Sequence, residues 1–260
     1  MSSPLVLTQQ AEEGIAILTL NRPEKRNALS KALMEACCGE LDAMYRDKNQ
    51  RVLILRGEGP VFCAGLDLDE TLAAESAEPT ARLIVRLLRS LYHLPLLTIA
   101  AVQGAAVAGG AGLMSACDFV VAASDARVGY PEVKRGLVAA SVMTLLRRQI
   151  RERDARELLL LGEMITAGRA LEIGLINRVV PGDKLMETVL TLARTALHAA
   201  PSALAQTKKL LDELSPCSLD QELDQALLYH LSARNSAEAR EGMAAFLEKR
   251  QPRWRSRSED

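Results

Sequence analysis

Aromatic side chains are scarce in this sequence, because phenylalanine, tyrosine and tryptophan together make up 3% of its 260 residues. Platforms that stack nucleic-acid bases and cages that hold quaternary amines both need several such rings. A charge surplus is also missing, since 32 lysines and arginines are balanced by 33 aspartates and glutamates, for a net charge of −1. We therefore expect no nucleic-acid partner, and Arg147, Arg148 and Arg151 are typical of a solvated helix face.

Paired cysteines and long apolar runs are missing as well. No window approaches the ~20 apolar residues of a membrane span, and the amino terminus lacks the basic start and apolar run of a signal peptide. The cysteines are odd in number and lack the spacing of a zinc site or a disulfide framework: Cys37, Cys38, Cys63, Cys117 and Cys217. We expect reduced thiols, no metal site, no membrane association and a cytoplasmic location.

Apolar residues are plentiful, at 48% of the chain, which is enough to bury a substantial core. The runs Leu5–Gln9 and Gly14–Leu20 predict an opening hairpin, and Arg51–Arg56 predicts a buried strand. Ser30 predicts a helix N-cap after the polar loop 21–29, because Leu33, Cys37, Leu41 and Met44 then share one face. The segment Glu70–Glu78 predicts a helix or a lid, and Thr80–His93 predicts an amphipathic helix.

The stretch Thr98–Asp118 contains almost no large polar side chain. Thr98–Val102 predicts a buried strand, and Gly109–Gly110 falls where a helix would begin. First-turn amides of a helix have no intrahelical acceptor, so this terminus can hold an anion or a developing oxyanion. A tightly packed crossover would explain the same small residues.

Strand patterns alternate with helix patterns as far as Val180, and only helix patterns follow Pro181. The predicted helices each begin with an Asp, Ser or Pro: Asp183–His198, Pro201–Leu214, Ser218–Ser232 and Ser236–Arg250. We therefore predict an α/β region over residues 1–182 and a helical region over residues 183–260.

Several motifs, in order, resemble those of the crotonase, or enoyl-CoA hydratase/isomerase, superfamily. They are NRPEKRNAL at 21–29, FCAGLDL at 62–68, AAVQGAAVAGGAGL at 100–113, SACD at 115–118, YPEVKRGL at 130–137, ITAGRALEIGLINRVVP at 165–181 and EGMAAFLEKR at 241–250. The resemblance covers essentially the whole chain. It implies a spiral of repeated ββα units that carries an acyl-CoA site, then a helical C-terminal region that packs subunits into a homotrimer or a dimer of trimers.

The resemblance also implies site residues and an enzymatic role in fatty acid metabolism. The backbone amides of Ala64 and Gly109 would form an oxyanion hole for the thioester carbonyl, and Glu132 would be the acid/base. Substrate contacts are expected from a set in four segments: Lys25, Arg26, Ala28, Ala64, Gly65, Leu66, Asp67, Gly109, Phe246 and Lys249. Coenzyme A would be part of the substrate, so no separate cofactor is expected.

One position departs from the family pattern. Hydratases of this family commonly use two glutamates, and the first should lie three residues beyond Gly109, where this chain has Gly112. A single base, Glu132, suffices to move a double bond along an acyl chain, which favours an isomerase. Asp67, Asp69 or Glu70 could reach the site, and the 70–95 and 137–145 regions are expected to line the acyl pocket.

Other activities stay open at this point. They are hydration with a non-standard second group, a lyase, hydrolase or decarboxylase reaction on a specialised acyl-CoA, and binding of a CoA ester without turnover. One scaffold of this kind can host many reactions.

Overall fold

The computed structural model describes residues 3–72 and 77–254. The predicted hairpin is present as β1 (Val6–Glu12) and β2 (Ile15–Leu20), which pair antiparallel. Helix α1 (Lys31–Arg46) follows, and the Ser30 side chain accepts a hydrogen bond of 3.2 Å from the Leu33 amide. The N-cap predicted at Ser30 is thus confirmed.

In the described part of the chain, the larger sheet has six strands in the order β1-β2-β3-β4-β6-β9. After the hairpin, β3 (Val52–Gly57), β4 (Leu97–Val102), β6 (Phe119–Ala123) and β9 (Arg178–Val180) continue it with parallel pairing. A second, smaller sheet joins β5 (Ala105–Val107), β7 (Arg127–Gly129) and β8 (Met164–Thr166). The sequence patterns did not predict β5 or β8, because three-residue strands show no readable alternation.

The two sheets are built by a repeated unit. The chain adds β4 to the large sheet, β5 to the small sheet, and then forms α4 (Gly109–Ala116). It repeats this course with β6, β7 and α5 (Ala140–Leu146). An earlier turn does the same after β3, where Cys63 bridges to Ala106 before α2 (Leu68–Leu72) and α3 (Ala77–Tyr92). The predicted spiral of ββα units is therefore present.

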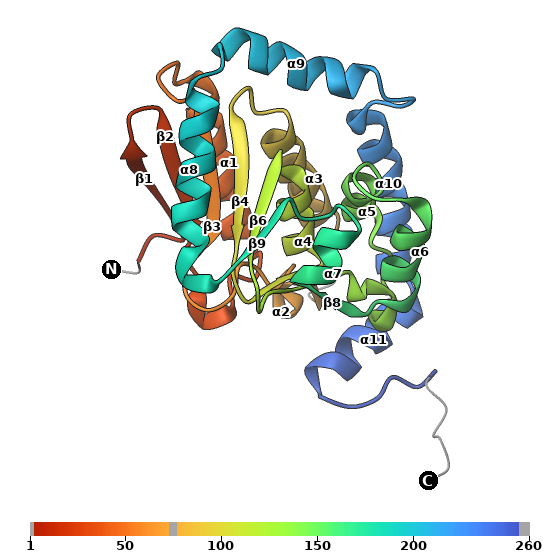
Figure 1. The fold of residues 1–260 in the computed structure, drawn as a ribbon. Coiled ribbons are helices and arrows are strands. Elements are labelled where there is room, and N and C mark those ends of the chain that lie inside the picture. Colours follow the sequence, from red (N-terminus) through yellow and green to blue (C-terminus); the bar gives the residue numbers. More distant parts are fainter. Residues whose placement is uncertain (1–2, 73–76, 255–260) are drawn as a thin grey trace.

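Helices cover both faces of the large sheet (Figure 1). Val52 and Ile54 of β3 face α8 (Leu185–Leu197), whereas Leu53 and Leu55 join the larger core formed with α1, α3 and α4. Alternate residues of one strand point to opposite faces, so a strand that is apolar throughout can supply both cores. This two-sided burial explains the continuous apolar run of β3.

The last part of the chain is helical, close to the predicted boundaries. After α8 come α9 (Pro201–Glu213), α10 (Leu219–Arg234) and α11 (Ala237–Leu247), and Figure 1 shows α9 across one end of the molecule. Ser218 and Ser236 cap α10 and α11 through their side chains. The remaining helices are α6 (Glu152–Leu161), α7 (Ala167–Glu172) and the short 3-10 turns Pro23–Lys25, Pro131–Arg135 and Gly182–Lys184.

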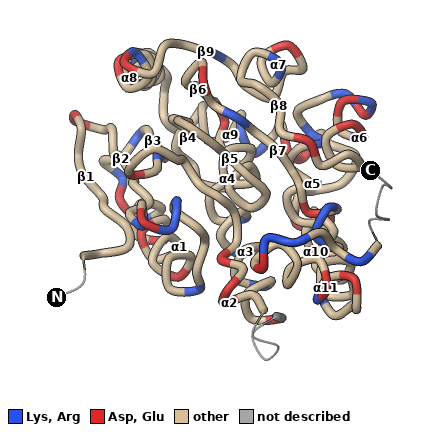
Figure 2. Tube along the Cα trace, turned by 90° about the horizontal axis from the view of Figure 1, so that it is seen from below, with Lys and Arg blue, Asp and Glu red and all other residues tan. Residues whose placement is uncertain are grey.

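Surface charge follows the balanced composition. Figure 2 shows lysine and arginine positions interspersed with aspartate and glutamate positions on outer helices such as α6, α7 and α8. Among the described residues, no helix combines the length and hydropathy that crossing a membrane would require. Cys37, Cys38, Cys63 and Cys117 are buried free thiols and Cys217 is an exposed one, as predicted.

Candidate active site

One cavity collects most of the residues that the sequence predicted to act together. Glu132 and Gly109 line it, and so do Ala64 and, from the α11 end of the chain, Phe246. The other predicted residues on its wall are Lys25, Arg26, Ala28, Leu66 and Asp67. Thr71, Ile84 and residues 137–142 complete much of the apolar wall, from the two regions expected to form the acyl pocket. Segments that are far apart in the sequence thus line one cavity.

Asn27 fastens the first loop of this cavity. Its side chain is fully buried, and its Nδ2 donates to the carbonyls of Glu58 at 2.9 Å and Val61 at 2.8 Å. Its Oδ1 accepts from the Arg22 amide at 2.9 Å. Arg26 and Asn27 both have φ above +50°, an uncommon backbone geometry that asparagine tolerates well. The loop over 22–28 is therefore held rigidly against the segment that carries Ala64.

The Ala64 amide is not available to a ligand, which corrects the predicted oxyanion donor. Its N–H donates to the Arg26 carbonyl at 3.0 Å, while the neighbouring Cys63 amide donates to Ala105 at 3.1 Å. The Leu66 amide, by contrast, has no acceptor among the described residues. Ala64 lines the cavity, but the free amide belongs to Leu66.

The Gly109 amide lies beside that of Leu66. A Cβ placed on Gly109 would be 3.7 Å from the Leu66 nitrogen. Gly109 begins α4, where amides have no intrahelical acceptor and carry the positive end of the helix dipole. The preceding Ala108 has φ 51° and ψ −119°, a strained conformation for alanine that is fixed by hydrogen bonds at both its N–H and its carbonyl. The amides of Leu66 and Gly109 are thus close neighbours, and neither has an acceptor among the described residues.

Gly65 and Lys249 do not line the cavity. Gly65 has φ +91°, and a Cβ there would come within 2.9 Å of the Val107 carbonyl, so the position needs glycine for the close approach of two backbones. Its carbonyl accepts from the Leu29 amide at 2.7 Å. Lys249 is exposed beyond the end of α11. Gly65 shapes the loop, and Lys249 has no contact with the cavity within this chain.

Glu132 lines the cavity and has a buried carboxyl group. It lies in the 3-10 turn Pro131–Arg135, whose N-cap Tyr130 is fully buried with its hydroxyl 3.1 Å from Ser115 Oγ. Glu132 Oε2 is buried and has no hydrogen-bond partner in the described part of the chain. Burial raises the pKa of Glu132 from 4.5 to about 7, although its own backbone amide and Arg135 oppose the shift. A carboxyl with such a pKa can both accept and return a proton near neutral pH.

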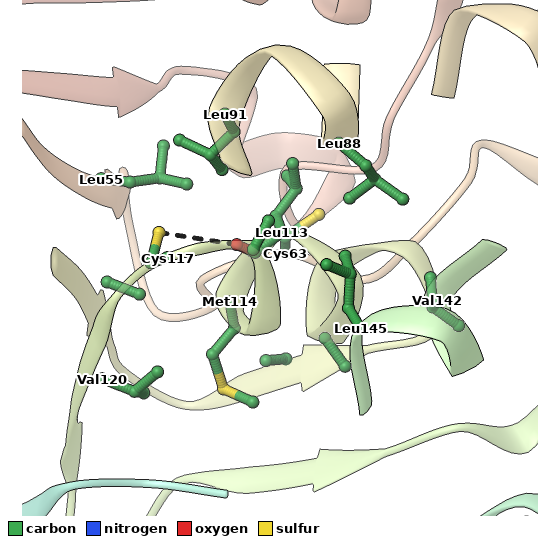
Figure 3. Packing of buried hydrophobic residues seen from close by; sticks show 14 of the residues in the cluster. Leu55, Cys63, Leu88, Leu91, Leu113, Met114, Cys117, Val120, Val142 and Leu145 are labelled. Atoms are coloured by element: carbon green, nitrogen blue, oxygen red, sulfur yellow. Dashed lines mark hydrogen bonds between the residues drawn. The ribbon is translucent and has the colours of Figure 1, made fainter. Parts of the chain in front are cut away.

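The position of Gly112 has no room for a second carboxylate. A Cβ at residue 112 would lie 2.4 Å from Val142 Cγ1 and 3.5 Å from Leu88 Cδ2. Figure 3 shows Val142 and Leu145 of α5 and Leu88 of α3 packed around α4, in the interior where this glycine is buried. The Val142 side chain thus fills the space that a glutamate side chain at position 112 would need.

The acidic residues at the cavity mouth already have cationic or backbone partners. Asp67 accepts from Arg22 at 2.6 Å, and Asp69 is 3.3 Å from Lys25. Glu70 accepts from the Lys31 amide at 2.8 Å and does not line the cavity. The predicted lid continues into residues 73–76, which lie outside the described residues. Asp118 is structural, since it accepts from Thr98 and from Lys208.

Two residues of the cavity wall, His230 and Arg234 of α10, carried no signal in the sequence. Arg135, from the motif at 130–137, and Ser141, from the region expected to line the acyl pocket, also line the cavity. Burial lowers the pKa of His230 to about 4, so its ring is neutral at pH 7. No local pattern could have found His230 or Arg234, because only the packing of α10 against α3 and α5 brings them here.

Comparison with known proteins identifies the family of this chain. The family model described as enoyl-CoA hydratase/isomerase matches residues 10–257. A provisionally named enoyl-CoA hydratase of Thermus thermophilus is 40% identical over 251 residues, which is 94% of this chain and 99% of the relative. The 2,3-dehydroadipyl-CoA hydratase of Escherichia coli is 35% identical and covers 98% of this chain and 100% of its own length.

Solved structures give the same result for the fold. A crystal structure of an enoyl-CoA hydratase from Mycobacterium avium superposes with a TM-score of 0.87 at 34% identity, covering 97% of this chain and 100% of that one. Family model, relatives and fold agree over nearly the whole length. The chain is an acyl-CoA enzyme that belongs to the enoyl-CoA hydratase/isomerase family, the crotonase superfamily.

Proposed function

We propose that this enzyme moves a double bond along an enoyl-CoA chain, with Glu132 as the single acid/base and the amides of Leu66 and Gly109 as the oxyanion hole. The observation that carries the proposal is the pairing of a partnerless buried carboxyl at Glu132 with a glycine at 112 whose side-chain space Val142 fills. The arrangement supplies one proton carrier and two free amides, which is what an allylic shift requires.

The reaction balances within these groups. The Glu132 carboxylate removes a proton from the α-carbon of a 3-enoyl-CoA, and the electron pair of that C–H bond moves into a dienolate whose negative charge lies on the thioester oxygen. The two amides stabilise this oxygen, and one preorganised donor of this kind is worth about 3 kcal/mol of barrier. Glu132 then returns the same proton to the γ-carbon, which leaves the double bond conjugated with the carbonyl.

The nucleotide end of the substrate has a place at the mouth of the same cavity. Lys25 and Arg26 are exposed there, next to Ala28 and the backbone of Leu66. Lysine and arginine can pair with phosphate oxygens, so these side chains suit the phosphates of coenzyme A. Phe246 is half exposed on α11, and together with Lys249 it remains proposed as a contact to the coenzyme A of a neighbouring subunit in a trimer.

Hydration is the second candidate, and the names of the relatives favour it. One relative, from Mycosarcoma maydis, is named an enoyl-CoA isomerase/hydratase and is 35% identical over 256 residues. Hydration would need a group other than Glu132 to hold the water, and Asp67 and Asp69 are engaged with Arg22 and Lys25. We therefore expect slow conversion of crotonyl-CoA, and rapid hydration would overturn the single-base proposal.

The direct test replaces the carboxyl by an amide. Glu132→Gln keeps the shape and removes the base, so isomerisation of a 3-enoyl-CoA should fall by about 10²–10⁴-fold. The absorbance of the conjugated thioester product follows the reaction. The matched control is Glu172→Gln, an exposed glutamate on α7, which should keep wild-type activity. Retention of activity in Glu132→Gln would remove Glu132 from the mechanism.

A further inference from the structure

Arg234 is a buried cation on the wall of the cavity without an acidic partner. Only 7% of its surface is exposed, and its one hydrogen bond among the described residues runs from Nη1 to the sulfur of Met243 at 3.2 Å. Thioether sulfur is a weak acceptor and carries no charge. Burial lowers the pKa of Arg234, yet a guanidinium stays protonated at neutral pH. The site therefore holds a positive charge that nothing in the described chain neutralises.

Two other groups on the same wall, the Ser141 hydroxyl and the Arg135 Nε–H, are hydrogen-bond donors without an acceptor among the described residues. Ser141 is 5% exposed, and its Oγ is buried without a hydrogen-bond partner. Arg135 has a buried Nε without a partner, and its guanidinium lies over the Phe246 ring at 4.1 Å. A buried donor left unpaired destabilises the protein, so a ligand that supplies an acceptor gains binding energy. Arg234, Ser141 and Arg135 all line the cavity that contains Glu132.

The acids of the cavity do not supply the missing partner. Asp67 and Asp69 pair with Arg22 and Lys25 at the mouth, and Glu24 lies 3.9 Å from Arg22. Glu132 interacts with Arg135, and no interaction joins it to Arg234 among the described residues. An uncharged acyl chain would leave the Arg234 charge buried and unpaired beside it, which is unfavourable. A ligand with its own anionic group removes that penalty.

We propose that the acyl chain of the substrate ends in a carboxylate, which Arg234 binds and to which Ser141 Oγ donates a hydrogen bond. Arg135 adds positive charge on the same wall. Arginine suits this task because its fork of N–H donors matches the two oxygens of a carboxylate. The assignment rests on the proposed enoyl-CoA reaction and adds its substrate class, a CoA thioester of a dicarboxylic acid.

The test compares two 3-enoyl-CoA substrates of six acyl carbons, one ending in a methyl group and one ending in a carboxylate. Wild-type enzyme should prefer the carboxylate substrate in kcat/KM by about 10–100-fold, since a hydrogen bond to a charged group is worth roughly 1.5–3 kcal/mol. Arg234→Met should abolish most of that ratio. Ser141→Ala, a smaller change, should lower it by about 3–10-fold, because it removes one uncharged donor to the carboxylate and leaves Arg234 in place. Arg153→Met on the exposed face of α6 is the matched control and should leave the ratio unchanged.

Binding separates this inference from the reaction itself. Calorimetry with the unreactive saturated pair, adipoyl-CoA and hexanoyl-CoA, should show the same preference and the same loss in Arg234→Met. Equal binding of the two esters by wild-type protein would overturn the carboxylate site even if isomerisation is found. If neither enoyl substrate is turned over, the proposed reaction fails, while a calorimetric preference for adipoyl-CoA would still support the site.

Discussion

The Glu132 carboxyl oxygen Oε2 is buried and has no hydrogen-bond partner among the described residues. Burial raises its pKa to about 7, so the folded protein binds a proton here between pH 4.5 and about 7 that the unfolded chain releases. The charged form therefore lowers the free energy of unfolding, and this penalty grows as the pH rises through that window. The buried Glu132 carboxyl therefore makes the folded protein less stable once the pH is high enough to ionise it.

This cost gives a prediction about stability and pH. Glu132→Gln removes the titration, so its free energy of unfolding relative to wild type should be greater at pH 8 than at pH 5 by about 2 kcal/mol, from a pKa shift of 4.5 to about 7. Urea unfolding at the two pH values measures the difference. An equal effect of the substitution at both values would mean that the carboxyl has an ordinary pKa.

Single residues also determine which backbone amide is left unpaired as the proposed oxyanion donor. Ala64 and Leu66 are two positions apart and both line the cavity, yet the Ala64 amide donates to Arg26. Asn27 sets this difference, because its side chain ties the loop that presents the Arg26 carbonyl. The free Leu66 amide follows from that one tethered loop.

Between elements, the contact of α4 with α5 decides whether a second carboxylate fits. Gly112 faces Val142 so closely that a Cβ at 112 would overlap the valine methyl group. Figure 3 shows Leu145 on the same side of α4, so the space is closed by a packed layer. Because Val142 on α5 occupies the space beside Gly112 on α4, the packing of these two helices leaves no room for a second glutamate at this position.

This contact predicts the outcome of restoring the glutamate. Gly112→Glu alone should destabilise the protein by about 1–3 kcal/mol through overpacking. Val142→Ala in the same chain should recover part of that loss, so the double variant should be more stable than the sum of the single effects. Urea unfolding of the two single variants and the double variant forms the cycle. The double variant should also hydrate crotonyl-CoA faster than wild type, and additive destabilisation would show that Val142 is not the obstacle.

On the scale of the whole molecule, α9 leaves an apolar face without a partner in the described chain. Leu210, Leu211 and Leu214 are 52%, 67% and 75% exposed on and just after this helix. Figure 1 shows α9 at one end of the molecule, apart from the sheet. We expect these adjacent exposed leucines to lie in a subunit contact of the proposed trimer.

The assembly can be tested by sedimentation. Wild-type protein should sediment as a trimer or a dimer of trimers, and the pair Leu211→Glu with Leu214→Glu should shift it toward monomer by placing charges in the contact. Tyr45→Glu, at a position 59% exposed on α1, is the control and should leave the assembly intact. A monomeric wild-type protein at micromolar concentration would contradict the proposal.

The sequence by itself determined the elements whose causes are local. Ser30, Ser218 and Ser236 mark helix starts because a capping hydroxyl acts on an amide three residues away. The ordered motifs also placed Glu132 and Gly109 in one site, and both line the same cavity.

Only the tertiary structure decided the rest, because those features depend on contacts between distant segments. The Ala64 amide donates to the Arg26 carbonyl, so the amide that lacks an acceptor among the described residues is that of Leu66. The packing of α5 on α4 places Val142 in the space beside Gly112. Arg234 lines the cavity because α10 packs beside α3 and α5. The sequence around residue 234 does not predict this packing. Local periodicity specifies which face of an element is buried, whereas the three-dimensional packing specifies what that face meets.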